Sequence, residues 1–254
     1  MSVAPQNFAA GHYAPRAQDY VTSAVHSSGA DLDQVEAEIR DMAGARVLDL
    51  GCGGGHVSYR AAPHVAEVMA CDVTEAMLQA VAATAAERGL GNIVTRQAAA
   101  EALPFADAAF DAVLCRFTTH HWQDMEGGLR EARRVAKRGA RAVFIDSIAP
   151  PDRAQDSHLQ AVELLRDASH GRNYSLAEWV AALSRAGFAV EGVTIRVLRM
   201  EFPTWIARTR TPAAHAAAIR SLQDGAAEAV RTHFAIGADG SFDLQAATIL
   251  ARAA

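Results

Sequence analysis

The chain has 254 residues, of which 50% are hydrophobic and 21% are charged, and its net charge is -5. This length and apolar content suffice for one α/β domain with its own core, or for such a domain with a small cap. The acidic balance argues against a nucleic-acid binder held by bulk electrostatics, and no stretch is apolar for long enough to span a bilayer.

The start of the chain and its cysteines bear on where the protein works. Residues 1–20 lack the basic and apolar regions of a secretory signal. Cys52, Cys71 and Cys115 are far apart in the sequence, so we expect neither a disulfide framework nor a zinc site. We therefore predict a cytoplasmic protein without a bound metal.

The first predicted helix runs from about Gln18 to Met42, with a break near Ser28-Gly29. Asp31 is a plausible N-cap for its second part, and Gly44 is a natural stop. Apolar residues at helical spacing support this helix, namely Leu32, Val35, Ile39 and Met42.

A short apolar run at Val47–Leu50, interrupted only by Asp49, leads into glycines at alternate positions, Gly51, Gly53 and Gly55. This pattern predicts a buried strand, a tight turn and then a helix. Glycine is favoured where the backbone takes a positive φ or comes close to another group. A helix N-terminus beside such a turn presents unpaired N–H groups and a positive potential. Together these features favour a nucleotide-type ligand at the carboxyl end of the strand, although a purely structural turn would also use glycine.

Between residues 40 and 150, β-like runs alternate with helical stretches. The predicted strands are Val47–Leu50, Val65–Cys71, Asn92–Thr95, Phe110–Cys115 and Ala142–Ile145. The predicted helices are His56–Ala62, Thr74–Arg88, which Thr74 can cap, and Met125–Arg138. Alternation of this kind predicts a parallel sheet built from right-handed crossovers.

Pro150-Pro151 ends this alternation. The later predicted elements are helices at 152–170 and Ser175–Ala186, β-like runs at Phe188–Phe202 and Phe242–Leu250, and an alanine-rich helical stretch at Thr204–Ala235. Ser175 and Glu178 have the spacing of a capping box. Three segments outside the strand framework are expected to cover the strand mouths as cap or substrate elements, namely residues 1–30, 150–175 and 203–235. Candidate apolar walls of a substrate pocket are Tyr13, Tyr20, Tyr174, Trp179, Trp205 and Phe234.

The mouth of the second predicted strand carries Asp72, which stands 21 residues after Gly51. An acidic side chain at this spacing is placed to accept hydrogen bonds from two ribose hydroxyls, although it could instead cap the next helix. A dinucleotide site would need glycine or alanine at the sixth position of the turn, where this chain has His56. The alternate glycines instead leave room for a smaller charged group, such as an amino-acid moiety.

Several segments, in their order and spacing, resemble the motifs of class I S-adenosylmethionine-dependent methyltransferases. They are Val47–Gly55 for the glycine turn, Cys71–Leu78 for the second strand, Ala100–Phe105 with Phe110–Val113 for the adenine-side loop and fourth strand, and Arg134–Gly139 for the turn before the fifth strand. The chain is most similar to the ubiquinone/menaquinone-biosynthesis type of small-molecule methyltransferase, with a type 11 domain. The resemblance covers about residues 40–150, the expected cofactor-binding core. It implies an α/β fold in one domain over residues 1–254: a Rossmann-like, doubly wound sheet of seven mostly parallel strands with an antiparallel last strand, plus helical cap elements.

The resemblance also implies S-adenosylmethionine as cofactor, S-adenosylhomocysteine as product, and roles for individual residues. Gly51, Cys52 and Gly53 would pass under the methionine part, Asp49 would help to fix its ammonium, and Asp72 would hold the ribose. The residues expected around the adenine are Val73, Met77, Ala100 and Glu101. Those expected to close the methionine side are Cys115, Arg116 and Phe117, with Tyr20 as a cover from the N-terminal helix.

Two positions depart from the family pattern. An acidic residue often stands two positions before Glu101, where this chain has Ala99, so backbone groups would have to serve the adenine amine. The usual Pro-Gly before the fifth strand is Arg138-Gly139 here, a change that we expect to be structural.

Methyl transfer from a sulfonium is an in-line displacement that depends on positioning and on the exclusion of water, with a base only where the acceptor loses a proton. His120 and His121, just past the fourth predicted strand, are the candidate bases, and they would suit a phenol, an amine or an enol. His121 could instead orient the following loop. Arg116 could bind an acidic substrate or pair with an aspartate or glutamate.

We therefore predict an S-adenosylmethionine-dependent methyltransferase that acts on a small-molecule acceptor, as a monomer or a homodimer. One alternative is a non-enzymatic module that binds the same cofactor and regulates a partner. Another is a nicotinamide-dependent oxidoreductase, which His56 disfavours. Carbon, oxygen and nitrogen acceptors all stay open at this stage.

Overall fold

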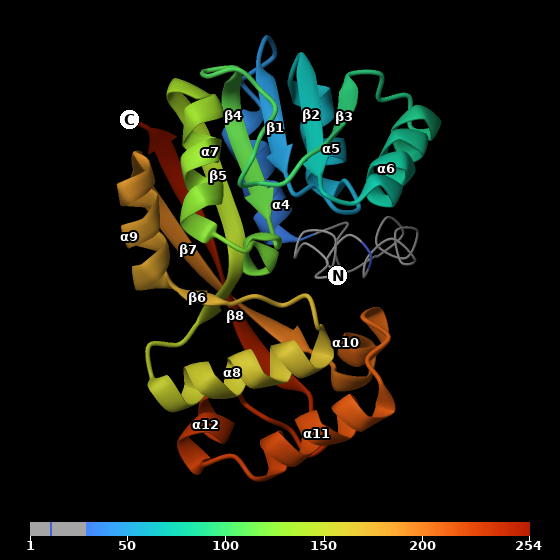
Figure 1. Cartoon of the computed structure of the whole chain (residues 1–254), viewed down its shortest axis with the longest axis vertical. Coiled ribbons are helices and arrows are strands. Elements are labelled where there is room, and N and C mark those ends of the chain that lie inside the picture. Colours follow the sequence, from blue (N-terminus) through green and yellow to red (C-terminus); the bar gives the residue numbers. More distant parts are fainter. Residues whose placement is uncertain (1–10, 12–28) are drawn as a thin grey trace, which may run out of the picture.

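A mixed sheet is the centre of the computed structural model, which describes residue 11 and residues 29–254 (Figure 1). Its strands are β1 (Arg46–Leu50), β2 (Glu67–Asp72), β3 (Ile93–Gln97), β4 (Phe110–Arg116), β5 (Ala136–Ala149), β6 (Tyr174–Ser175), β7 (Phe188–Met200) and β8 (Phe242–Ala253). They are ordered β3-β2-β1-β4-β5-β8-β7, and the short β6 pairs with β5 off this path. Strands β1 to β5 are parallel, whereas β8 is antiparallel to both β5 and β7. The predicted Rossmann-like sheet with an antiparallel last strand is confirmed.

Helices cover both faces of this sheet. The helices of the described residues are α4 (Ala30–Ile39), α5 (His56–Ala61), η2 (Ala62–His64), α6 (Glu75–Glu87), η3 (Thr119–His121), α7 (Met125–Val135), α8 (Arg153–Arg166), α9 (Leu176–Ala186), α10 (Phe202–Arg208), α11 (Ala213–Asp224) and α12 (Glu228–His233). In β1, Val47 packs with α4 and α5, whereas Leu48 packs with α7 and α9, because successive side chains of a strand point to opposite faces. Strands that are buried on both faces are apolar throughout, which explains the continuous apolar runs in the sequence.

Four helices, α8, α10, α11 and α12, gather at the end of the molecule where β7 and β8 extend beyond the other strands (Figure 1). We call these four helices the helical lobe. Its core contains Leu159 from α8, Trp205 from α10 and Ile219 from α11, packed on Phe242 of β8. The Trp205 and Phe242 rings meet edge to face with their centroids 4.9 Å apart. The lobe is therefore joined to the sheet through strands that belong to both.

Several element boundaries differ from the predictions, because a run of apolar residues does not by itself show where one element ends and the next begins. Helix α7 ends at Val135 rather than Arg138, and β5 begins at Ala136 rather than Ala142. The extra residues form an irregularity in the pairing of β4 with β5, where Gly139 adopts a φ of 76°. The predicted helix at 152–170 ends at Arg166, and the stretch Thr204–Ala235 is three helices rather than one.

The predicted helix caps have mixed outcomes. Ser175 and Glu178 form the capping box of α9 as predicted. Asp31 does not cap α4, because Gly29 occupies the N-cap and the Asp31 carboxylate accepts from Arg116 Nε at 2.5 Å instead. Thr74 stands at the N-cap of α6 without a side-chain capping bond. Among the described helices, none combines the length and the apolar composition that a membrane crossing requires.

Candidate functional site

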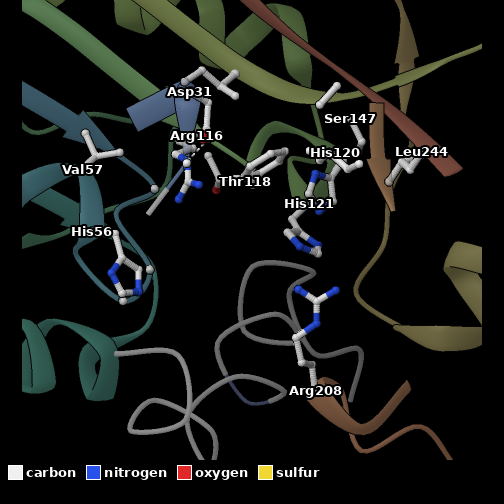
Figure 2. A pocket seen from close by; sticks show the side chains of 18 of the residues that line it. Asp31, His56, Val57, Arg116, Thr118, His120, His121, Ser147, Arg208 and Leu244 are labelled. Carbon is white, nitrogen blue, oxygen red and sulfur yellow. Dashed lines mark hydrogen bonds and ion pairs between the residues drawn. The ribbon is translucent and has the colours of Figure 1, made fainter. Parts of the chain in front are cut away.

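A cavity of about 840 Å³ lies at the carboxyl ends of β1, β2 and β4 and continues to the helical lobe (Figure 2). Its sheet side is lined by Asp49, Asp72 and the turn at 51–54, and its lobe side by residues that include Arg166 and Trp205. The carboxyl ends of the strands are where open α/β sheets bind ligands, and this volume is typical of small-molecule pockets.

The glycine turn between β1 and α5 forms the floor of the sheet side. Gly51, Gly53 and Gly55 all have a positive φ, of 72°, 48° and 78°. A Cβ on Gly51 would lie only 2.3 Å from the hydroxyl oxygen of Thr118. A Cβ on Gly53 would meet nothing within 4 Å, so the turn is open to the cavity there. The backbone conformation thus explains all of these glycines. Close packing adds a second reason at Gly51 and at Gly55, where a Cβ would lie 2.8 Å from the Tyr59 ring.

Asp72 joins the mouth of β2 to the glycine turn. Its Oδ2 accepts from the backbone N–H of Gly53 at 2.9 Å, and its Oδ1 accepts from that of Thr74 at 2.8 Å. Burial raises the pKa of Asp72, and these backbone hydrogen bonds partly offset that rise. The carboxylate therefore supports the start of α6 and also lines the cavity.

Asp49 is a buried acid beneath the turn. It is 1% exposed, and Ser58 Oγ donates to its Oδ2 at 2.6 Å. Burial raises the pKa of Asp49 to about 7, although the Ser58 hydrogen bond acts in the opposite direction. Because Asp49 lines the cavity, a cation bound there would favour its charged form.

A smaller cavity of about 60 Å³ adjoins the first, since Asp72 and Val73 line both. Ala100 and Glu101, predicted at the adenine edge, line this smaller cavity. Glu101 Oε1 accepts from the backbone N–H of Gln123 at 2.9 Å, which ties this wall to the loop after η3.

The residues predicted to close the methionine side separate into two groups. Arg116 and Phe117 line the larger cavity, and so does Met77 of α6, which was predicted around the adenine. Arg116 forms an ion pair with Asp31, as in the alternative in which it pairs with an aspartate or glutamate, and it also lines the cavity. Cys115 is 2% exposed and packs in the core on the α7 side, so its position does not support the predicted role. Alternation along β4 turns its side chain away from the face that bears Arg116.

His120 in η3 lies at the cavity wall beside the end of β5 (Figure 2). Its Nδ1 is 2.6 Å from Oδ1 of Asp146, and its backbone N–H donates to Oδ2 of the same carboxylate at 3.2 Å. Burial disfavours a charged imidazole, but the nearby Asp146 carboxylate outweighs this, so the pKa of His120 is raised. His120 therefore favours the protonated form more than an ordinary histidine does.

His121, the other candidate base, has the opposite properties although its ring lies only 4.1 Å from that of His120. Burial, together with the positive charge of His120, lowers the pKa of His121 to about 3. Its Nδ1 is 3.1 Å from the carbonyl oxygen of Ser169, so it orients the loop after α8. This contact is with the loop after α8 and not with the loop that follows His121, which was the predicted alternative.

The lobe side of the cavity contains residues that the sequence did not single out. Ser147 comes from β5, Glu163 and Arg166 from α8, and Leu244 from β8. Asp146 of β5 is buried behind this wall, where it contacts His120. Asp146 directly follows the last residue of β5 that pairs with β4, a position similar to that of Asp72 at the end of β2, and this parallel was the available signal. The positions of α8 and β8 depend on the tertiary fold.

The aromatic residues proposed as apolar walls are mostly elsewhere. Trp205 lines the cavity, whereas Trp179 is in the core on the α7 and α9 side and Phe234 is in the lobe core. Tyr174 packs against that first core. The positions predicted for Tyr13 and Tyr20 lie outside the described residues.

Comparisons with known proteins match large parts of this chain. Residues 48–144 match the family model described as a methyltransferase domain. The Escherichia coli (strain K12) protein YafE is 44% identical over 192 residues, which cover 76% of this chain and 93% of that protein. The uncharacterized methyltransferase YcgJ of Bacillus subtilis (strain 168) is 34% identical over 224 residues, 88% of each chain.

The crystal structure of YcgJ extends this likeness to the fold, with a TM-score of 0.84 at 33% identity over 87% of this chain and 97% of that chain. A more limited likeness connects the chain to the ubiquinone/menaquinone biosynthesis C-methyltransferase UbiE of Serratia proteamaculans (strain 568). The two are 34% identical over 123 residues, which cover 45% of this chain and 49% of that protein.

Proposed function

Since this chain belongs to the S-adenosylmethionine-dependent methyltransferases, we propose that its acceptor is a small molecule, methylated in the cavity between the sheet and the helical lobe. The extent of the cavity carries this proposal. The residues assigned to the cofactor line only its sheet side, and the same space continues past Thr118 to Ser147 and Arg166. A cavity of this kind suits a compound that fits between the two sides.

The residues on the sheet side fit the cofactor. Gly53 leaves open space above the turn, Asp72 stands where the two cavities meet, and the buried Asp49 lines the larger cavity. We assign the adenine to the junction of the two cavities beside Val73, the ribose to Asp72 and the methionine part to the turn, with its ammonium near Asp49. When bound there, the cofactor supplies a methyl group on a positively charged sulfur.

The chain itself contributes position and exclusion of water. Trp205 of the lobe and Leu244 of β8 line the acceptor side with apolar surface. An acceptor enclosed by them is held near the end of the glycine turn with little competing water, and such positioning supplies much of the rate in a displacement reaction.

Calorimetry tests the cofactor assignments. S-adenosylhomocysteine should bind the purified protein, and Asp72→Ala should weaken that binding strongly because a ribose contact is lost. Asp111→Ala is a matched control, since Asp111 lies at the opposite end of β4, where it pairs with Lys137. Unchanged affinity in Asp72→Ala would refute the ribose assignment.

A labelled methyl group tests the acceptor class. The protein is incubated with S-adenosylmethionine carrying a radioactive methyl group and with a cell extract that has been separated by size. We expect label in the small-molecule fraction. Label confined to protein or nucleic acid would contradict a small-molecule acceptor and leave the methyltransferase family intact.

A further inference from the structure

The ring of His120 presents its two nitrogens in a defined way. The Asp146 carboxylate only accepts, so the proton shared between them lies on Nδ1. Among the described residues none bonds Nε2, and Nε2 is not one of the buried polar atoms left without a partner. Nε2 therefore reaches the cavity that His120 lines. In the neutral ring it is a lone pair facing the place assigned to the acceptor.

Hydrogen bonds fix the position of Asp146 and of the His120 ring that it orients. It is 3% exposed, and its Oδ1 also accepts from the backbone N–H of Ser147 at 2.8 Å. On the other side, the backbone N–H groups of Gly171 and Arg172 donate to the carbonyl of His120 at 2.7 and 3.1 Å. A Cβ on Gly171 would lie 3.1 Å from that carbonyl oxygen, so the loop packs closely on η3. The His120 side chain is therefore fixed before any ligand arrives.

Of the three neighbouring histidines, His120 is the one that can accept a proton at neutral pH. His121 and His170 face it, and burial lowers the pKa of His170 to about 4, so both are neutral at neutral pH. Negative charge near His120 comes from Asp146 and, further away, from Glu163 and Asp167. A histidine that gains a proton here is stabilised by these carboxylates.

The other side chains on the acceptor side indicate which class of proton-losing acceptor would bind there. Trp205, Met200 and Leu244 provide apolar walls, which suit a ring or another planar carbon skeleton. Arg166 and Arg208 also line this side, with Glu163 as the acidic side chain among them, and Figure 2 shows Arg208 pointing toward His121 across the cavity. Arg166 forms an ion pair with Glu163 at 3.3 Å. The apolar walls disfavour a charged ammonium acceptor, because it would lose its hydration there.

From this arrangement we propose that His120 is the catalytic base, that Asp146 is its positioning residue, and that the acceptor is an apolar phenol or enol. The inference rests on the proposed function and names the acceptor chemistry within it. The O–H bond of the acceptor breaks and its proton passes to His120 Nε2. The electron pair left on the acceptor forms the bond to the methyl carbon, while the pair of the carbon–sulfur bond stays on sulfur. The proton on His120 then returns to solvent.

A chromophoric phenol tests the base directly. The probe is 4-nitrophenol, which absorbs visible light only as its anion, added to the protein saturated with S-adenosylhomocysteine. In the wild type the bound probe should ionise at a pH lower by about one to three units than in solution, because its proton passes to His120 beside Asp146. His120→Gln should remove this shift, and His64→Gln, at a surface site paired with Glu36, is the matched control.

The histidines can also be followed by NMR with labelled imidazole rings. Asp146→Asn should lower the pKa of His120 and reduce the ionisation of the probe, whereas Asp146→Glu should restore part of both, which a merely structural role would not predict. Retention of affinity for S-adenosylhomocysteine shows that each variant is folded.

The inference is overturned if the wild type binds S-adenosylhomocysteine but does not ionise the probe. It is also overturned if His121→Gln removes the ionisation while His120→Gln keeps it. Failure of the wild type to bind S-adenosylhomocysteine would instead contradict the proposed function, so the two failures are distinguishable.

Discussion

Replacing Asp49 by asparagine should stabilise the protein without ligand at neutral pH and should weaken cofactor binding. Asp49 is 1% exposed, and burial raises its pKa from 3.8 to about 7. Between roughly pH 4 and pH 7, Asp49 is therefore protonated in the folded protein and ionised in the unfolded chain. The stability linked to that proton is complete below the unfolded pKa and is lost as the pH rises through the folded pKa.

The size of the effect follows from the shift. One pKa unit corresponds to about 1.4 kcal/mol, so the rise from 3.8 to about 7 corresponds to about 4 kcal/mol in total. Asparagine has a similar shape and no charge, so the variant does not incur this loss. Between about pH 5 and pH 8, the stability of Asp49→Asn relative to the wild type should rise by about 3 kcal/mol.

Urea unfolding followed by circular dichroism over this pH range measures the difference. Asp224→Asn is the control, because that side chain is 64% exposed and pairs only across the surface of α11 with Arg220. A difference between Asp49→Asn and the wild type that does not vary with pH would refute the reasoning. In calorimetry, the affinity of the wild type for S-adenosylhomocysteine should increase toward pH 8 as the carboxylate forms, and the variant should bind weakly at every pH.

Three further substitutions test the packing around the site. Gly51→Ala should lower the melting temperature more than Gly53→Ala, because both have a positive φ but only the first adds an overlap with Thr118; equal losses would contradict this. Gly171→Val should displace the His120 backbone and lower turnover while calorimetry shows unchanged S-adenosylhomocysteine affinity, and a matching loss of affinity would count against it. Trp205→Ala should cost about 3 to 5 kcal/mol in urea unfolding, because the ring is 1% exposed in the lobe core; a loss below about 1 kcal/mol would show that the lobe does not unfold with the sheet.

The cofactor side could be predicted from the sequence because its signals are local. Consecutive residues determine the turn of Gly51, Gly53 and Gly55, since the positive φ values belong to the backbone of that segment itself. Asp72 follows at a spacing that one βαβ unit sets. The sequence also predicted that the strand before the turn is buried, but the raised pKa of Asp49 depends on how completely the layers cover β1.

The acceptor side is a product of the tertiary structure. His120 and Asp146 are 26 residues apart and meet only because β4 and β5 are neighbours in the sheet. Asp31 and Arg116 are 85 residues apart and meet because α4 packs across the same strand ends. By itself, the sequence predicted the fold from its alternating elements and the cofactor from its resemblance to a methyltransferase family, because the motifs of both are short segments of the chain. Which histidine can hold a proton, and what faces it from the lobe, were decided only by strand order and burial, because both arise when distant segments pack together.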